Sequence, residues 1–393
     1  SEAIRKVGSK TAGRRLAKAA GAPVVPGTED AVSGPDDARR IARELGYPVL
    51  LKAAAGGGGK GMRRVDSEAQ LESALRDAAS EAERAFRSGE VYVEKFVLQP
   101  RHIEIQVLGD RYGHLIHLGE RECSLQRRHQ KVVEECPSQL VASRPRLRAA
   151  MGDAALRIAK AAGYVNAGTL EFLVDADANF YFLEMNTRLQ VEHPVTELAT
   201  GLDLVHWQLR IAAGEPLTLR QEDIVLRGSA IECRVYAEDP DAGFLPSPGQ
   251  ITALTEPSGP GVRLDSGVFP GWVVPLEYDP LLAKLAVWAE TREAALERAR
   301  RALAEYSVSG IRTNIAFFRD ILDDPEFRSG RLHTGFIEEF FRRRPALSGP
   351  DEETLQATVL AAALSAIDRR KESATPQHGA SRWAEQGRGA LLR

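Results

Sequence analysis

One ten-residue stretch, which starts at Glu184 and reads EMNTRLQVEH, is rich in groups that could bind a ligand. In an extended conformation alternate residues point to the same side of the chain. One side would then carry two carboxylates, two amides and a guanidinium, from Glu184, Asn186, Arg188, Gln190 and Glu192. Ordering these groups together is costly unless they serve a ligand. A solvated sheet face is the alternative, which the preceding apolar sequence FYFL disfavours.

Another acidic residue, on a neighbouring predicted strand, suggests a metal site. Glu171 lies in the sequence GTLEFL, and the turn sequence DADAN separates it from Glu184 and Asn186. These segments predict a hairpin over residues 168–174 and 180–186. If its loop is even-numbered, the two glutamates face each other and repel unless a cation lies between them. With the amide they suit Mg²⁺ bound to nucleotide phosphates, and a structural pair of surface acids is the alternative.

The sequence KAAAGGGGKGM, from Lys52 to Met62, has the composition of a phosphate-binding loop. Four consecutive glycines let backbone amides converge on an anion with no side chain in the way. It is not a Walker A loop, because Lys60 is followed by Gly61 and a strand-like run. A glycine loop between two strands predicts a mobile flap over phosphates, and a flexible hairpin loop is the alternative.

The segment ERECSLQRRHQK, from Glu120 to Lys131, is dense in hydrogen-bond donors. It could serve an anionic substrate or be an exposed charged loop, and its sequence favours neither. His102, His129 and His193 are too scattered for a zinc site, and three cysteines are too few for a disulfide framework. We therefore expect a reducing, cytoplasmic location.

The composition is that of a soluble globular protein. The 393 residues include 52 basic and 55 acidic side chains, and 43% of the chain is hydrophobic. This length predicts two or three domains. A net charge of −3 argues against nucleic-acid binding, and no apolar run or leader indicates a membrane segment.

The apolar periodicity predicts a mixed α+β fold with much antiparallel sheet. A capping box, Ser67 with Gln70, is expected to start a long helix that ends at Gly89. The other predicted helices cover residues 4–20, 35–45, 146–162, 292–306 and 352–369, and the other strands cover 49–53, 91–96, 103–108, 114–118 and 282–288.

Taken together and in this order, these segments resemble biotin carboxylase, the ATP-grasp component of biotin-dependent carboxylases such as acetyl-CoA and propionyl-CoA carboxylase. The resemblance spans residues 10–344 and includes the motifs VEKF, RHIE, ECR and FLPSPG. The segments 126–135 and 184–197 separate the chain from other ATP-grasp ligases.

The resemblance implies an α+β architecture in three parts. Residues 1–225 would form an ATP-grasp domain with a mobile lid at about 24–96. Residues 226–344 would form the biotin carboxylase C-terminal α+β domain, and 345–393 a helix and polar linker tail.

The resemblance also implies the ligands of a nucleotide site. Glu171, Glu184 and Asn186 would hold Mg²⁺ or Mn²⁺. ATP would be bound by lysines, the glycine loop and an adenine-side cluster: Lys10, Lys52, Gly56, Gly57, Gly58, Gly59, Gly61, Glu94, Lys95, Val97, His102, Gln126 and His129.

For the reaction, the resemblance implies that Glu192 is the base that deprotonates bicarbonate. Attack on the γ-phosphate would give carboxyphosphate, which yields CO₂ and a phosphate able to deprotonate biotin. Arg234 would stabilise the biotin enolate. Bicarbonate would be held by Lys131, Arg188, Gln190 and Val191.

The expected partners are a biotin carboxyl carrier, a carboxyltransferase and further copies of the chain. The family's N-terminal α/β domain and a biotin-attachment sequence are not found in these residues. Biotin would therefore arrive on a carrier, in the first half-reaction of an acyl-CoA carboxylase. The alternatives are another ATP-grasp carboxylate or carbamate ligase, and an ATP-binding assembly module without turnover.

Overall fold

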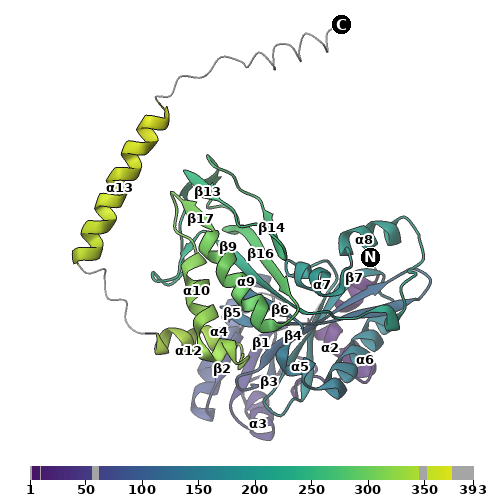
Figure 1. The fold of residues 1–393 in the computed structure, drawn as a ribbon. Helices are drawn as coiled ribbons and strands as arrows, with labels where there is room; N and C mark the ends of the chain where they lie inside the picture. The colour runs from purple at the N-terminus through teal and green to yellow at the C-terminus, as the bar shows by residue number, and fades with distance from the viewer. Residues whose placement is uncertain (1, 9, 55–61, 345–351, 374–393) are drawn as a thin grey trace. The chain divides into compact units, whose positions relative to one another are not determined.

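The computed structural model describes residues 2–8, 10–54, 62–344 and 352–373. Residues 1–342 form one compact unit, and residues 343–393 a second. In the first unit, an eight-stranded sheet runs through the middle, and every neighbouring pair of its strands is antiparallel (Figure 1). In spatial order its strands are β14 (Val262–Ser266), β16 (Leu281–Ala289), β9 (Ser229–Tyr236), β6 (Gln130–Cys136), β5 (Leu115–Arg127), β4 (Arg101–Gly109), β7 (Asn166–Val174) and β8 (Phe180–Asn186).

The middle strand β4 shows how alternation divides the sheet into an apolar and a polar face. Ile103, Ile105 and Val107 pack into a core with helix α6 (Pro145–Ala162). Residues between them, His102, Glu104 and Gln106, are also buried, and alternation places them on the opposite face. A β-strand buried on both faces thus carries its polar groups into the interior, where they need partners.

Helices cover both faces of this sheet. α6 and the N-terminal helices α1 (Glu2–Val7) and α2 (Lys10–Ala19) share one core. α7 (His193–Thr200) packs against β5, β6, β9 and β16, and α8 (Leu204–Ala212) against β7. The shorter helices of this region are α5 (Gln139–Ala142) and the 3₁₀ turn Gln221–Asp223.

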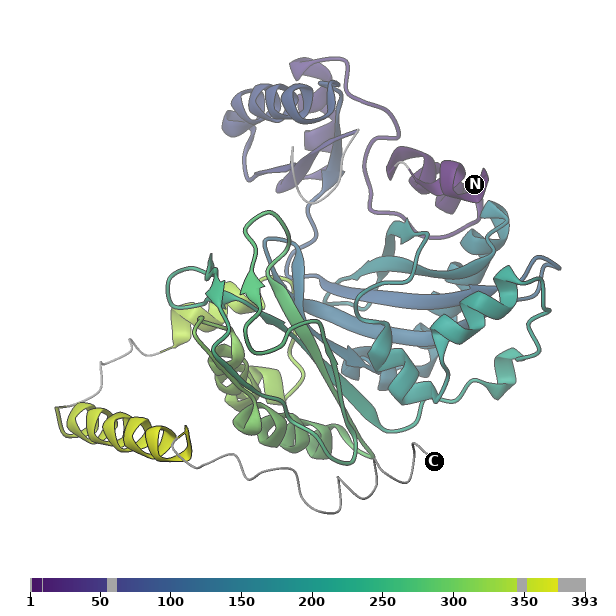
Figure 2. The ribbon, with the colours of Figure 1, turned by 90° about the horizontal axis from the view of Figure 1, so that it is seen from above.

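Residues 35–54 and 62–95 build a smaller layer with its own core, seen apart from the large sheet in Figure 2. Its sheet has the order β2 (Met62–Val65), β1 (Val49–Ala53), β3 (Val91–Lys95), and helices α3 (Pro35–Leu45) and α4 (Glu68–Phe86) pack on it. The bounds predicted for α3 and β1 are confirmed. This layer falls inside the expected lid.

The C-terminal part of the first unit extends the same sheet instead of starting a new one. β9 pairs with β6 on one side and with β16 on the other. Helix α9 (Arg292–Glu305) packs on β9 and β16, and α10 (Ile315–Asp323) packs on α9. The remaining elements are α11 (Pro325–Arg328), α12 (Phe336–Arg343), β10 (Glu238–Asp239), β11 (Leu245–Pro246), β12 (Gly249–Gln250), β13 (Ala253–Thr255), β15 (Val273–Val274) and β17 (Ser307–Ser309).

In the second unit the described element is helix α13 (Glu352–Ser373), which extends slightly beyond the predicted 352–369. No helix in the described ranges is both long and apolar enough to cross a bilayer.

Three local predictions are wrong. The single helix expected over residues 4–20 is two helices, α1 and α2. The Ser67 side chain makes no cap bond; the Gln70 N–H donates to the Ser67 carbonyl at 3.2 Å, and Gln70 Oε1 accepts from the backbone N–H of Asp66 at 3.1 Å. Helix α4 ends at Phe86, three residues before Gly89, since Arg87 already adopts a left-handed conformation with φ of 57°.

A buried arginine ties α9 to the sheet. Arg292 Nε and Nη2 donate to the Glu135 carboxylate at 2.6 and 2.9 Å, and the same guanidinium bonds the carbonyls of Phe327 and Arg328.

We expect Arg292→Ala to lower the free energy of unfolding by about 3–5 kcal/mol, because it leaves the buried Glu135 carboxylate without its cation. Denaturant unfolding measures this. Arg301→Ala, which removes an exposed pair with Glu305, is the control and should cost below about 1 kcal/mol; equal losses would contradict the prediction.

Candidate active site

The register of three strands brings acidic side chains together. Glu104 of β4 lies opposite Glu171 of β7, and Glu171 lies opposite Glu184 of β8. The prediction that Glu171 and Glu184 face each other is therefore confirmed, but the even-numbered loop on which it depended is not found. The loop has five residues, 175–179, and a bulge between β7 and β8 supplies the extra residue that shifts the register.

The ammonium of Lys131 lies at the centre of this acidic group. Its Nζ is 2.6 Å from Glu104 Oε2, 2.9 Å from Glu171 Oε1 and 2.6 Å from Glu192 Oε1. Burial opposes the charge of Lys131, but the surrounding anions outweigh burial and raise its pKa well above the usual value. Burial likewise opposes ionisation of Glu104, yet Arg121 and Lys131 lower its pKa to about 2. Glu104 and Lys131 are thus both ionised at neutral pH.

Arg121 is fully buried and bonds residues of the cluster. Its guanidinium bonds Glu104 Oε1 at 2.5 Å and Gln190 Oε1 at 3.1 Å, together with the hydroxyls of Thr169 and Thr196. Residues up to Arg127 belong to strand β5, so the alternative of an exposed charged loop is wrong for them. Arg121 instead belongs to an interior frame, because its donors find acceptors within the sheet and on α7.

Glu192 links the cluster to the C-terminal part of the sheet. Its Oε2 lies 2.9 Å from Arg234 Nη2, and the Arg234 Nε donates to Glu134 Oε1 at 2.6 Å. Glu192 is 2% exposed and stands at the N-terminal end of α7. One carboxylate therefore contacts cations from two different strands, Lys131 of β6 and Arg234 of β9.

The predicted continuous polar ribbon is wrong beyond Asn186. Strand β8 ends there and the chain turns into α7, whose first turn contains Pro194. Gln190 and Glu192 still reach the cluster, and Gln190 Nε2 donates to Glu171 Oε1 at 2.8 Å. Arg188 does not: it is exposed and donates to the Leu189 carbonyl at 3.2 Å. The Val191 carbonyl accepts from Lys284 Nζ at 3.1 Å.

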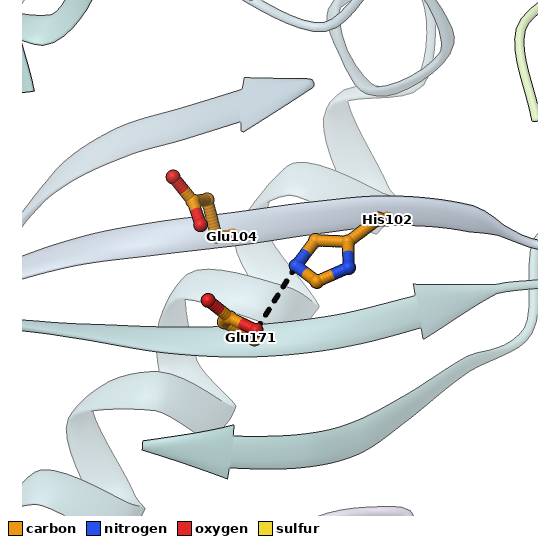
Figure 3. A group of neighbouring side chains, drawn as sticks. All are labelled: His102, Glu104 and Glu171. Carbon is orange, nitrogen blue, oxygen red and sulfur yellow. Dashed lines mark ion pairs between the residues drawn. The ribbon is translucent and has the colours of Figure 1, made fainter. Parts of the chain in front are cut away.

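Three neighbouring groups could hold a cation. Figure 3 shows His102 and Glu104 on β4 beside Glu171 of β7, with the His102 ring directed toward Glu171; His102 Nε2 is 3.1 Å from Glu171 Oε2. One potential ligand atom from each lies within 4.8 Å of the others. The predicted magnesium ligands Glu171, Glu184 and Asn186 lie together. Asn186 Nδ2 donates to Glu171 Oε1 at 3.0 Å, and the strand register places Glu184 opposite Glu171. Carboxylate oxygens of this kind suit Mg²⁺.

A second group, Glu104 with Cys123 and Glu192, meets the same distance criterion. Burial raises the pKa of the Cys123 thiol well above its usual value. Its sulfur is also a softer ligand than the carboxylate oxygens that Mg²⁺ prefers.

The predicted nucleotide residues lie in several environments. Lys52 Nζ bonds Glu94 Oε2 at 2.5 Å, and Arg14 also pairs with that carboxylate. Lys95 instead donates to the Gly46 carbonyl at 2.7 Å. Gln126 donates to the Cys123 carbonyl, His129 lies in the β5–β6 turn, and Val97 follows β3. The Lys10 side chain and the glycines Gly56, Gly57, Gly58, Gly59 and Gly61 lie outside the described residues.

The sequence motifs missed part of the site. Four of its residues lie within motifs named above but receive no role from the sequence: Glu104, Arg121, Glu134 and Glu232. Alternating polar residues in RHIEIQVL were the available signal for Glu104. Nothing local marks Glu134, because its partner Arg234 is 100 residues away.

Fold and site together define an ATP-grasp enzyme architecture. Residues 9–220 match the family model for the carbamoyl-phosphate synthase L chain ATP-binding domain, and residues 232–339 match the biotin carboxylase C-terminal domain. The chain belongs to the biotin carboxylase family. The predicted resemblance and fold class are thereby confirmed.

Curated relatives support this membership. Biotin carboxylase 1 of Populus trichocarpa, a chloroplastic protein, is 51% identical over 86% of the chain and 63% of its own length. Biotin carboxylase of Nostoc is 49% identical over 86% of the chain and 75% of its own length. A pyruvate carboxylase component of Methanothermobacter thermautotrophicus is also 51% identical, over 86% of the chain and 68% of its own length. The chain therefore spans about two thirds of the length of these relatives.

Solved structures share the fold. The biotin carboxylase domain dimer of Hydrogenobacter thermophilus 2-oxoglutarate carboxylase, in complex with MgADP, ADP and bicarbonate, has a TM-score of 0.82 and 48% identity. The match covers 86% of this chain and 74% of that one. A biotin carboxylase–β,γ-ATP complex from Campylobacter jejuni has a TM-score of 0.83 and 46% identity, over 86% and 75% of the two chains.

Removing the central ammonium should destabilise the cluster in a pH-dependent way. We expect Lys131→Met to lower the free energy of unfolding by about 3–5 kcal/mol near pH 7, because it leaves buried carboxylates uncompensated. Lys131 lowers the pKa of Glu104 and Glu171 in the folded state, a stabilisation present above their unfolded pKa and lost at lower pH. The deficit should therefore shrink below about pH 5.

Denaturant unfolding between pH 4 and pH 8 measures this difference. Lys160→Met, at an exposed position of α6, is the matched control and should change little at any pH. A deficit that is equal at both ends of the range would contradict the ionised cluster.

Proposed function

We propose that this chain carries out the ATP- and Mg²⁺-dependent carboxylation of biotin with bicarbonate, through carboxyphosphate. The observation that carries the proposal is the buried Glu192 carboxylate, held between Lys131 and Arg234 next to the Glu104–Glu171 acids. The named relatives and the solved neighbours support it.

Glu192 is the proposed base for bicarbonate. Its two oxygens bond two different cations, so its charge is fixed in position and its orientation is defined. Lys131 presents an ammonium beside it that can attract a small anion, and Gln190 offers an amide in the same cluster. Such placement replaces a chance encounter of base and anion by a fixed one.

Arg234 is the proposed partner of the negative charge that develops on biotin. Its guanidinium has five donors and does not lose its proton at neutral pH. Arg188, also predicted to contact bicarbonate, would reach the site only after its side chain turns away from Leu189.

The magnesium nucleotide is assigned to the other end of the acidic group. Glu171, Glu184 and Asn186 supply the oxygen ligands proposed for Mg²⁺, which when bound offsets charge on the transferring phosphoryl group. Lys52, His102 and the described adenine-side residues are the proposed ATP contacts. The predicted roles of the glycine loop stay predictions.

A biotin carboxyl carrier is the proposed biotin donor, and a carboxyltransferase the proposed consumer of carboxybiotin. Assembly with further copies is also proposed, in line with the dimer in the Hydrogenobacter structure. The curated relatives include chloroplastic and mitochondrial proteins, so the expected cytoplasmic location stays a prediction.

Steady-state ATP hydrolysis tests the proposed reaction. The purified chain should hydrolyse ATP in a manner that requires Mg²⁺ and bicarbonate and is stimulated by free biotin. Stimulation by another carboxylate or by a carbamate, with none by biotin, would favour a different ATP-grasp ligase. ATP binding without any turnover would favour the assembly module.

Glu192→Gln should separate nucleotide binding from chemistry. We expect biotin carboxylation to fall by about 10²- to 10⁴-fold, because the amide cannot accept the proton of bicarbonate. Calorimetric affinity for ATP should remain within about twofold, because the lost charge serves proton removal. Parallel loss of affinity and turnover would contradict the role of Glu192 as base.

Glu184→Gln should instead weaken the binding of ATP with Mg²⁺. We expect the Mg²⁺ concentration for half-maximal ATP binding to rise by about tenfold or more, since a charged oxygen ligand is removed. Glu222→Gln, at an exposed ion pair with Arg220, is the matched control. Unchanged metal dependence would rule out Glu184 as a ligand.

A further inference from the structure

Two buried acids near Arg234 have no role in the proposed reaction. Glu134 of β6 and Glu232 of β9 are directly opposite each other in the sheet, and both are 0% exposed. Within the described part of the chain, Glu134 Oε2 and both oxygens of Glu232 have no hydrogen-bond partner. Buried polar atoms normally have partners, so three orphaned oxygens on facing side chains call for an explanation.

The charges around Glu232 do not neutralise it. Arg234 bonds Glu134 and Glu192 but not Glu232. Lys284 of β16 lies 3.1 Å from Asp265 and also donates to the Val191 carbonyl. The ionisable groups of α7, which packs on β6, β9 and β16, are His193 and Glu197, and Glu197 pairs with Arg263.

Two facing carboxylates in a dry interior cannot both remain ionised at low cost. Burial raises the pKa of Glu232 well above the usual value, and Glu134 raises it further. Burial also raises the pKa of Glu134 to about 7, although Arg234 opposes the shift. Because Glu134 is bonded to a cation and Glu232 is not, Glu232 is the member that keeps a proton.

We propose that Glu134 and Glu232 are a proton-sharing pair that positions Arg234: neutral Glu232 donates to the free oxygen of Glu134, whose other oxygen holds the guanidinium. The inference rests on the proposed function for its kinetic consequence. One proton satisfies Glu134 Oε2 and one oxygen of Glu232 together. It also limits the negative charge behind Arg234, so that the guanidinium remains available to an anion on its substrate side.

The proton itself is tested by stability against pH. A group that keeps its proton in the folded state and loses it on unfolding makes the protein less stable as the pH rises above its unfolded pKa. We expect the thermal midpoint of the wild-type chain to fall relative to that of Glu232→Gln between about pH 5.5 and pH 8.5. Glu222→Gln should run parallel to the wild type. A Glu232→Gln midpoint displaced equally at all pH values would overturn the shared proton.

The positioning role is tested by comparing two variants. Glu134→Gln should raise KM for free biotin or lower kcat by about tenfold with KM for ATP unchanged, because Arg234 loses a charged anchor. Glu232→Gln should change both by less than about threefold, because its amide still donates to Glu134. Unchanged biotin kinetics in an active Glu134→Gln chain would overturn the role.

Crystal structures of both variants separate this inference from the proposed function. Arg234 should keep its contact with Glu192 in Glu232→Gln and lose its present orientation in Glu134→Gln. An unmoved guanidinium in Glu134→Gln would overturn the positioning role. If the chain shows no biotin-dependent turnover, the proposed function fails, while the titration and the two structures still decide the acid pair.

Discussion

The site depends on one ammonium surrounded by carboxylates. Lys131 contacts Glu104, Glu171 and Glu192 at 2.6–2.9 Å, and each of these acids is almost completely buried. Without a shared cation, such anions would repel one another and take up protons. Arg121 extends the compensation beneath the cluster. The ionic network therefore holds the Glu192 carboxylate between Lys131 and Arg234 in the interior of the fold.

The continuous antiparallel sheet explains how distant residues reach this network. The β6–β9 pairing joins the segment before α7 to the segment after it, and it brings Arg234 within reach of Glu192. The matched ATP-binding and C-terminal family regions thus contribute to one layer and one site. The same pairing has an energetic cost, because it places the carboxyl groups of Glu134 and Glu232 opposite each other where neither is exposed to solvent.

Strand periodicity predicted much of the local structure correctly, including the β7–β8 hairpin and the facing of Glu171 and Glu184. The loop length did not predict this pairing. A five-residue loop alone would not place Glu171 opposite Glu184, and the β-bulge between β7 and β8 shifts the register by one residue so that they do pair. Beyond Asn186 the alternating pattern misled, because a helix start replaced the strand. Arg188 is consequently exposed, while Gln190 and Glu192 reach the cluster through the turn.

The sequence alone determined the family and the order of the motifs, and it supplied most residues of the proposed nucleotide and base sites, because these are carried by short contiguous segments. Tertiary structure alone decided which cation compensates which acid. The segment from Glu120 to Arg127 looked equally suited to solvent or substrate, and only pairing in the sheet made it an interior frame. Compensation of charge depends on distances between strands far apart in the chain, which local pattern does not encode.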